Sequence, residues 1–115
     1  MQKTKIVLLN AVSLSMIPEE WTETTLRVRK TSLEEVRTLL TTHEFESAVG
    51  HQSTADFLTA LLGVQIKAER RQVTFQPDTL YVVFQLIGRL PEGRVLTEEE
   101  LRAINYRFYT VEVLA

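Results

Sequence analysis

Four stretches of the chain carry hydrophobic patterns that are typical of β-strands. Residues 5–9 form a short, almost wholly apolar run, which predicts a strand with both faces covered. Residues 24–30 alternate polar and apolar side chains, which predicts a strand with one face in water. The stretch 107–114 alternates in the same way, and residues 80–87 are strongly apolar and rich in β-type side chains. Both predict further strands.

A fifth strand is expected over residues 72–76, where Val73 and Phe75 alternate with polar residues. Pro77 and Asp78 are expected to turn the chain into a hairpin with the strand at 80–87. The stretch 45–49 fits either a short extended segment or a loop.

Helix starts are marked by a hydroxyl residue followed three positions later by an acid, the pattern of a capping box. Ser32 with Glu35 precedes apolar residues at helical spacing, which predicts a helix over 33–42. Thr97 with Glu100 predicts another helix just before the final strand. Together with a helix over 54–62, the elements predict an α/β fold, in which a mixed sheet of about five strands is flanked by helices. Function is then expected at the strand ends.

Length and composition narrow the functions that the chain can have. At 115 residues, one domain spanning 1–115 is expected. Thirteen basic and fifteen acidic residues give a net charge of -2, so a broad basic surface for duplex nucleic acid is not expected. The absence of cysteine excludes disulfides and a cysteine nucleophile. No stretch approaches the ~20 apolar residues of a membrane helix, and residues 6–9 are too short for a secretory signal, so the cytoplasm is the expected location.

The stretch 50–54 (Gly-His-Gln-Ser-Thr) is the most informative part of the chain. Ser53 with Asp56 resembles a capping box, and Gly63 stands where a C-terminal cap belongs, so a helix is expected over 54–62. A helix N-terminus leaves backbone N–H groups unpaired and can bind a phosphate without a lysine. Histidine transfers protons near neutral pH. The stretch therefore predicts an anion site with a proton donor, with a capped core helix beside a surface histidine as the alternative.

Two further polar residues follow predicted strands. Ser13 follows the first strand, and Arg89 follows the strand at 80–87. If those strands are parallel, both residues gather with His51 at one edge of the sheet. The alternatives are a loop or capping serine and a surface arginine. A zinc or iron site is not expected, because His43 and His51 lack a carboxylate cluster at ligand spacing.

Other residues have structural interpretations that outweigh functional ones. His43 is expected to stabilise the C-terminal end of the helix at 33–42. The aromatic residues Tyr106, Phe108 and Tyr109 fit a stacking platform for bases, but core and cross-strand packing is the more common role in a terminal strand.

With these residues in place, the chain resembles the small dimeric viral anti-CRISPR ring nucleases of type III systems and their cellular relatives. The resemblance covers nearly the full length and lies in the order and spacing of several short pieces. These pieces are residues 9–13, 49–54, 80–85, 89–97 and 108–113. Between Met16 and Glu46 only the types of element match, so no functional residue is carried over there.

The resemblance implies a metal-independent nuclease without a cofactor that binds cyclic tetra-adenylate (cA4) and cuts it into linear di-adenylates, which silences type III CRISPR signalling. On the family pattern His51 is the general acid, Arg89 stabilises charge on the scissile phosphate, and Glu92 joins this catalytic set at the pocket wall. The ligand-binding residues that the pattern implies are Asn10, Ser13, Ser53, Thr54, Arg70 and Gln85. Arg70 is chosen over its neighbour Arg71 on spacing.

The chemistry of this reaction suits the residue types. A ribose 2′-OH beside a 3′-phosphate is a nucleophile that the substrate already contains, so the enzyme has to align it, neutralise charge and protonate the leaving 5′-oxygen. The expected products carry a 2′,3′-cyclic phosphate and a 5′-hydroxyl. A fourfold-repeating ring suits a C2 homodimer with two identical half-sites. Two other functions stay open: a module that binds the ring without cutting it, and a structural or regulatory dimer with a protein or nucleic-acid partner.

Overall fold

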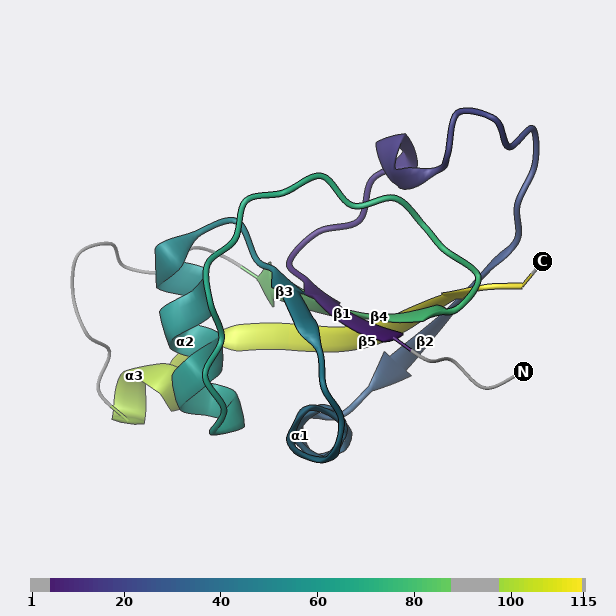
Figure 1. The fold of residues 1–115 in the computed structure, drawn as a ribbon. Coiled ribbons are helices and arrows are strands. Elements are labelled where there is room, and N and C mark those ends of the chain that lie inside the picture. The colour runs from purple at the N-terminus through teal and green to yellow at the C-terminus, as the bar shows by residue number, and fades with distance from the viewer. Residues whose placement is uncertain (1–4, 88–97, 115) are drawn as a thin grey trace.

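In the computed structural model, which describes residues 5–87 and 98–114, five strands form one mixed sheet (Figure 1). The order across the sheet is β2-β5-β4-β1-β3. The strands are β1 (Lys5–Leu9), β2 (Leu26–Thr31), β3 (Glu46–Ala48), β4 (Thr79–Ile87) and β5 (Asn105–Val113). β1 pairs in parallel with both β3 and β4, whereas β5 pairs antiparallel with β4 and β2. The predicted α/β fold with a five-stranded mixed sheet is therefore confirmed.

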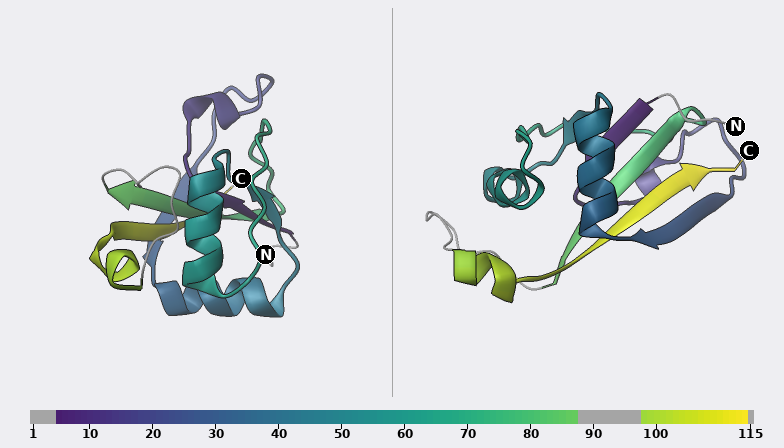
Figure 2. Two further views of the ribbon diagram at one scale, coloured as in Figure 1. Left: turned by 90° about the vertical axis from the view of Figure 1, so that its left-hand side faces the viewer. Right: turned by 90° about the horizontal axis from the view of Figure 1, so that it is seen from below.

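Two of the described helices, at residues 33–42 and 52–62, cover one face of this sheet, and irregular segments lie over the other (Figures 1 and 2). The helices are α1 (Leu33–Thr42), α2 (Gln52–Leu62), α3 (Glu98–Ala103) and the short 3-10 helix η1 (Leu14–Met16). Val36 of α1 and Leu58 of α2 are fully buried against Leu8, Phe84 and Phe108 of the sheet. This burial is the main force that holds the helices on the sheet.

The opposite face has a second core around Tyr81, where Phe75 and Met16 pack against the strands. The Tyr81 hydroxyl accepts a hydrogen bond from the Gln76 N–H at 2.7 Å and donates to the Thr74 carbonyl at 3.0 Å. Burial raises the pKa of this phenol above its ordinary value. The tyrosine thereby fixes the segment before β4 to the sheet.

The predictions for β1, α1 and the end of α2 are confirmed at their exact bounds. The Ser32 hydroxyl accepts a hydrogen bond from the Glu35 N–H at 3.1 Å, as the capping box requires. Gly63 caps α2 in the left-handed conformation, with φ of 74°. The strand expected over 24–30 runs from Leu26 to Thr31, and the ambiguous stretch 45–49 contains β3.

The start of α2 differs from its prediction. The helix begins at Gln52, and His51 rather than Ser53 is the N-cap residue. Asp56 does not close a capping box, because its carboxylate accepts a hydrogen bond from the Gln52 side-chain amide at 2.8 Å. This i to i+4 contact stabilises the first turn of the helix, and His51 precedes that turn as the N-cap.

The expected strand over 72–76 is wrong, and so is the hairpin that it was to form. The segment has no regular structure, although the turn at Pro77 and Asp78 is present. Phe75 is fully buried, and its N–H donates to the Met16 carbonyl at 2.7 Å rather than to a strand. The alternation of Val73 and Phe75 therefore reflects packing of a loop over the second core, which produces the same pattern as a strand.

Replacing Gly63 by alanine is expected to destabilise the fold by about 1 kcal/mol, because an L-residue is disfavoured at positive φ. No atom lies within 4 Å of the added methyl group, so the backbone conformation alone causes the loss. Gly50→Ala is the matched control. A methyl group there makes only ordinary contacts and the φ of Gly50 is not positive, so a change below about 0.5 kcal/mol is expected. Urea unfolding measures both, and equal losses would contradict the assignment.

Candidate functional site

The candidate site lies at the edge of the sheet where β1, β3 and β4 end, which we call the rim. The register pairs Leu9 with Ala48 on one side and with Val83 on the other, so the chain leaves β1 and β3 at the same level. Figure 1 shows that α2 begins on this side of the sheet. Carboxyl ends of parallel strands beside a helix N-terminus are a common place for ligands in open α/β sheets.

His51 connects β3 to α2 at this rim. Its backbone is extended, with φ of −127° and ψ of 134°, and its carbonyl accepts the first helical hydrogen bond, from the Ala55 N–H at 3.0 Å. The imidazole is exposed and does not cap the helix. An exposed imidazole is accessible to a ligand, and the helix that follows it begins with N–H groups that have no partner within the helix.

Arg70 lies beside this connection, although it is distant in sequence. Ala68 forms a parallel bridge with Val49, and the Glu69 N–H donates to the Val49 carbonyl at 2.8 Å. A methyl group built on Gly50 would lie 3.9 Å from Arg70 Cγ and 4.0 Å from its Nε. The guanidinium is exposed next to the loop that carries His51. Its positive charge and the dipole of α2 together favour an anion here.

The neighbouring arginine has another role. Arg71 forms an ion pair with Glu46 of β3, with 3.2 Å between Nη2 and Oε2. Both groups are exposed, so the pair adds little to stability. The contact nevertheless draws Arg71 toward the start of β3, and this geometry favours Arg70 as the arginine beside the connection that carries His51.

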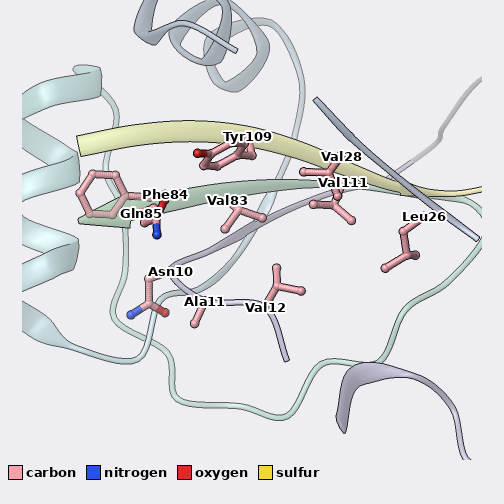
Figure 3. A pocket seen from close by; sticks show the side chains of 10 residues that line it. All are labelled: Asn10, Ala11, Val12, Leu26, Val28, Val83, Phe84, Gln85, Tyr109 and Val111. Atoms are coloured by element: carbon pink, nitrogen blue, oxygen red, sulfur yellow. The ribbon is translucent and has the colours of Figure 1, made fainter. Parts of the chain in front are cut away.

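Asn10 and Gln85 lie at the same end of a pocket of about 410 Å³ (Figure 3). Asn10 directly follows β1, and Gln85 stands on β4 two positions beyond the residue that pairs with Leu9. The opposite end of the pocket is apolar, with Val12 and Leu26 in view (Figure 3). The two amides supply donors and acceptors at the rim, whereas the valines and leucine offer only apolar contact.

The hydroxyl residues of the prediction have different environments. Ser53 and Thr54 stand in the first turn of α2, where Ser53 is half-buried and Thr54 is buried. Ser13 caps η1, because its hydroxyl accepts from the Ser15 N–H at 3.1 Å and contacts the Ser15 hydroxyl at 2.7 Å. Ser13 does not line the pocket that contains Asn10. The structure thus gives Ser13 a local capping role.

Arg89 and Glu92, two of the three predicted catalytic residues, lie outside the described residues. His43, by contrast, closes α1, with its Nδ1 3.2 Å from the Leu39 carbonyl and 2.9 Å from the Thr42 hydroxyl. Within residues 5–87 and 98–114, no three histidine, aspartate or glutamate side chains come together in a way that would hold a metal ion.

Several residues that line the pocket were not among the predicted ligand-binding residues. Val28, Val83 and Tyr109 come from three adjacent strands and face the same side as Gln85. The alternation over 24–30 and 107–114 already placed Val28 and Tyr109 on one face of their strands. Only the pairing of β2, β5 and β4 shows that these faces coincide.

Comparison with known proteins then places the chain among its relatives. The sequence profile described as STIV B116-like matches residues 6–108. The chain belongs to this family. "Uncharacterized protein 26" of Sulfolobus islandicus filamentous virus is 34% identical over 110 residues, which cover 95% of this chain and 92% of that protein. "Uncharacterized protein ORF117" of Acidianus two-tailed virus is 30% identical over 109 residues, which cover 92% and 93% of the two chains.

A bacterial protein is also similar to this chain. "Uncharacterized protein YddF" of Bacillus subtilis is 34% identical over 85 residues, covering 72% of this chain and 79% of the relative. Among solved structures, B116 of Sulfolobus turreted icosahedral virus superposes with a TM-score of 0.80 and 28% sequence identity, covering 94% of this chain and 98% of B116. This likeness confirms the α/β fold. No described helix is long and apolar enough to cross a membrane.

Proposed function

We propose that the protein is a metal-independent ring nuclease that binds cA4 and cleaves it to linear di-adenylates, and thereby counters type III CRISPR signalling. The observation that carries this proposal is the position of His51, which is exposed at the N-terminus of α2 and directly follows Gly50, beside which Arg70 lies. A proton donor, a fixed positive charge and the N–H groups of a helix N-terminus thus lie along one short connection at the rim.

These groups match the needs of attack by a ribose 2′-OH. The 2′-OH loses its proton to solvent as its oxygen attacks phosphorus, the bond to the 5′-oxygen breaks, and the products are a 2′,3′-cyclic phosphate and a 5′-hydroxyl. His51 would protonate the leaving 5′-oxygen, and Arg70 with the α2 N–H groups would stabilise the charge that develops on the phosphate. Asn10 and Gln85 would bind the neighbouring nucleotide. Arg89 and Glu92 complete the proposed catalytic set.

The proposal includes a C2 homodimer with the ring on its axis. One chain offers a single His51, whereas a ring of four nucleotides that is cut into two di-adenylates needs two cleavages. Two copies related by a twofold axis would present identical half-sites to the two scissile phosphates.

The test is chromatography of cA4 after incubation with the purified protein and excess chelator. Conversion to linear di-adenylates is expected. If denaturation returns intact ring that had been bound, the protein sequesters the messenger instead of cutting it. If the ring is neither cut nor bound, the proposal fails, and the result favours the alternative of a structural or regulatory dimer. Repeating the assay at protein concentrations from nanomolar to micromolar tests the dimer. A monomer that cleaves the ring at the normal rate would exclude the dimer as the active form.

A further inference from the structure

Half of the sheet face opposite α1 and α2 is not covered by any described element. The irregular segments around Met16 and Phe75 cover the part near Tyr81 and Val113, where they form the second core. The face is open at the C-terminal end of β4, where Ile87 is 44% exposed, and along the edge strand β2, where Val28 is 59% exposed. A half-covered sheet face is a place where a ligand or a partner binds.

Four polar or aromatic side chains stand on this open half, and we call them the platform: Lys30, Gln85, Arg107 and Tyr109. The register pairs Lys30 with Tyr109 and Gln85 with Arg107. Directly opposed side chains have Cβ atoms about 4.5–5.5 Å apart. The four residues therefore occupy neighbouring positions on three strands.

Contacts on the other face confirm the orientation of these strands. Thr31, next to Lys30, donates a hydrogen bond to Glu35 of α1 at 2.7 Å. Phe108, between Arg107 and Tyr109, is buried among the aromatic rings beneath α2. Because successive side chains in a strand point to opposite faces, Lys30, Arg107 and Tyr109 face away from the helices.

The platform is positively charged in a protein whose net charge is -2. Lys30 and Arg107 are exposed, and neither forms an ion pair with a described residue, whereas Arg27 and Arg71 do. A second copy packed directly onto this face would bring like charges together and desolvate them, which is unfavourable. An anion that lies on the face would neutralise them.

The aromatic ring narrows the choice of anion. Tyr109 is half-buried and lines the pocket, with its hydroxyl directed toward the end that holds Asn10 and Gln85 (Figure 3). An aromatic ring flanked by cations is the arrangement with which proteins bind single-stranded nucleotides, by stacking on the base and contacting the phosphates. The Gln85 amide can contact a base edge at the same place.

We infer that the platform is a second contact area for the cyclic oligoadenylate, in which Tyr109 stacks on an adenine while Lys30 and Arg107 bind phosphates. This inference rests on the proposed function, which it deepens. Cleavage takes place at the rim around His51, and the platform binds a nucleotide next to the one being cut. In a twofold dimer, each copy would offer its own platform to one half of the ring.

The experiment measures the affinity for cA4 by calorimetry in a His51→Ala background, so that the ring stays intact. Lys30→Ala and Arg107→Ala are each expected to weaken binding about tenfold and to lower the salt dependence of log Kd by about 0.7. Tyr109→Leu is expected to weaken binding at least about tenfold, while Tyr109→Phe retains most of the affinity, because stacking does not need the hydroxyl.

Arg29→Ala is the matched control, since it removes the same charge from the same strand but on the opposite face. It is expected to bind as the parent does. Loss of affinity for Arg29→Ala equal to that for Lys30→Ala would overturn the inference, as would unchanged affinity in the Arg107→Ala and Tyr109→Leu proteins. Sedimentation without ring provides the second measurement. If the platform variants shift the oligomeric state and leave ring affinity intact, the face binds another copy and the inference is wrong.

The two proposals fail in different ways. If the platform variants bind the ring as tightly as the parent and the wild-type protein cleaves it, the ring nuclease proposal stands and only the platform inference fails. If the wild-type protein neither binds nor cleaves the ring, both proposals fail.

Discussion

Replacing His51 by alanine is expected to lower the rate of cA4 cleavage at least ~100-fold while the affinity for the ring is retained, because a positioned general acid contributes about 10²- to 10⁴-fold. The structure gives a reason to expect that this substitution changes the chemistry without disturbing the fold. The imidazole is exposed and makes no capping hydrogen bond, so its removal leaves α2 and its N–H groups in place. Single-turnover cleavage and calorimetry on the same protein separate the chemical step from binding.

His43→Ala is the matched control, because this histidine is also exposed but closes α1 through contacts with Leu39 and Thr42. It is expected to cleave as the wild type does. A His51→Ala protein that cleaves at an unchanged rate would remove His51 from the mechanism. A protein that loses binding and cleavage together would make His51 a binding residue instead.

Replacing Phe84 by alanine is expected to cost about 4 kcal/mol, which is a large part of the 5–15 kcal/mol that stabilises a typical domain. The side chain is 1% exposed at the centre of the sheet. Its ring lies 5.7 Å from that of Phe57 and 5.5 Å from that of Phe108, measured between centroids. Truncation leaves a cavity between α2 and the sheet, and rigid neighbours fill it only in part.

Urea unfolding at a fixed protein concentration measures this loss. Leu14→Ala serves as the control, because this leucine is 82% exposed on η1 and its truncation is expected to change stability by less than about 0.5 kcal/mol. A loss below about 1.5 kcal/mol in the Phe84 variant would mean that the core around α2 collapses onto the missing ring.

The sequence predicted those parts of the candidate site that depend on neighbouring residues. It did not predict the parts that form where distant segments of the chain come together. The stretch 50–54 predicted a helix N-terminus with a histidine, and α2 begins within it. The helix starts at Gln52, two residues before the start that the capping signal indicated. The choice of Arg70 over Arg71 rested on spacing alone. The geometry that favours it comes from the bridge between Val49 and Ala68 and from the ion pair of Arg71 with Glu46.

The sequence by itself determined the elements whose interactions are local. A capping box at Ser32 and a glycine at position 63 act within one helical turn, and an apolar run at 5–9 needs only burial, so α1, the end of α2 and β1 follow from neighbouring residues. Only the tertiary structure decided whether the alternating stretches became strands. Residues 107–113 pair with strands on both sides. Phe75, in contrast, lies in a loop, and its N–H bonds to the Met16 carbonyl rather than to a strand. The register between strands likewise brought Asn10 to Gln85 and Lys30 to Tyr109, because strand pairing is set by contacts between residues far apart in the chain.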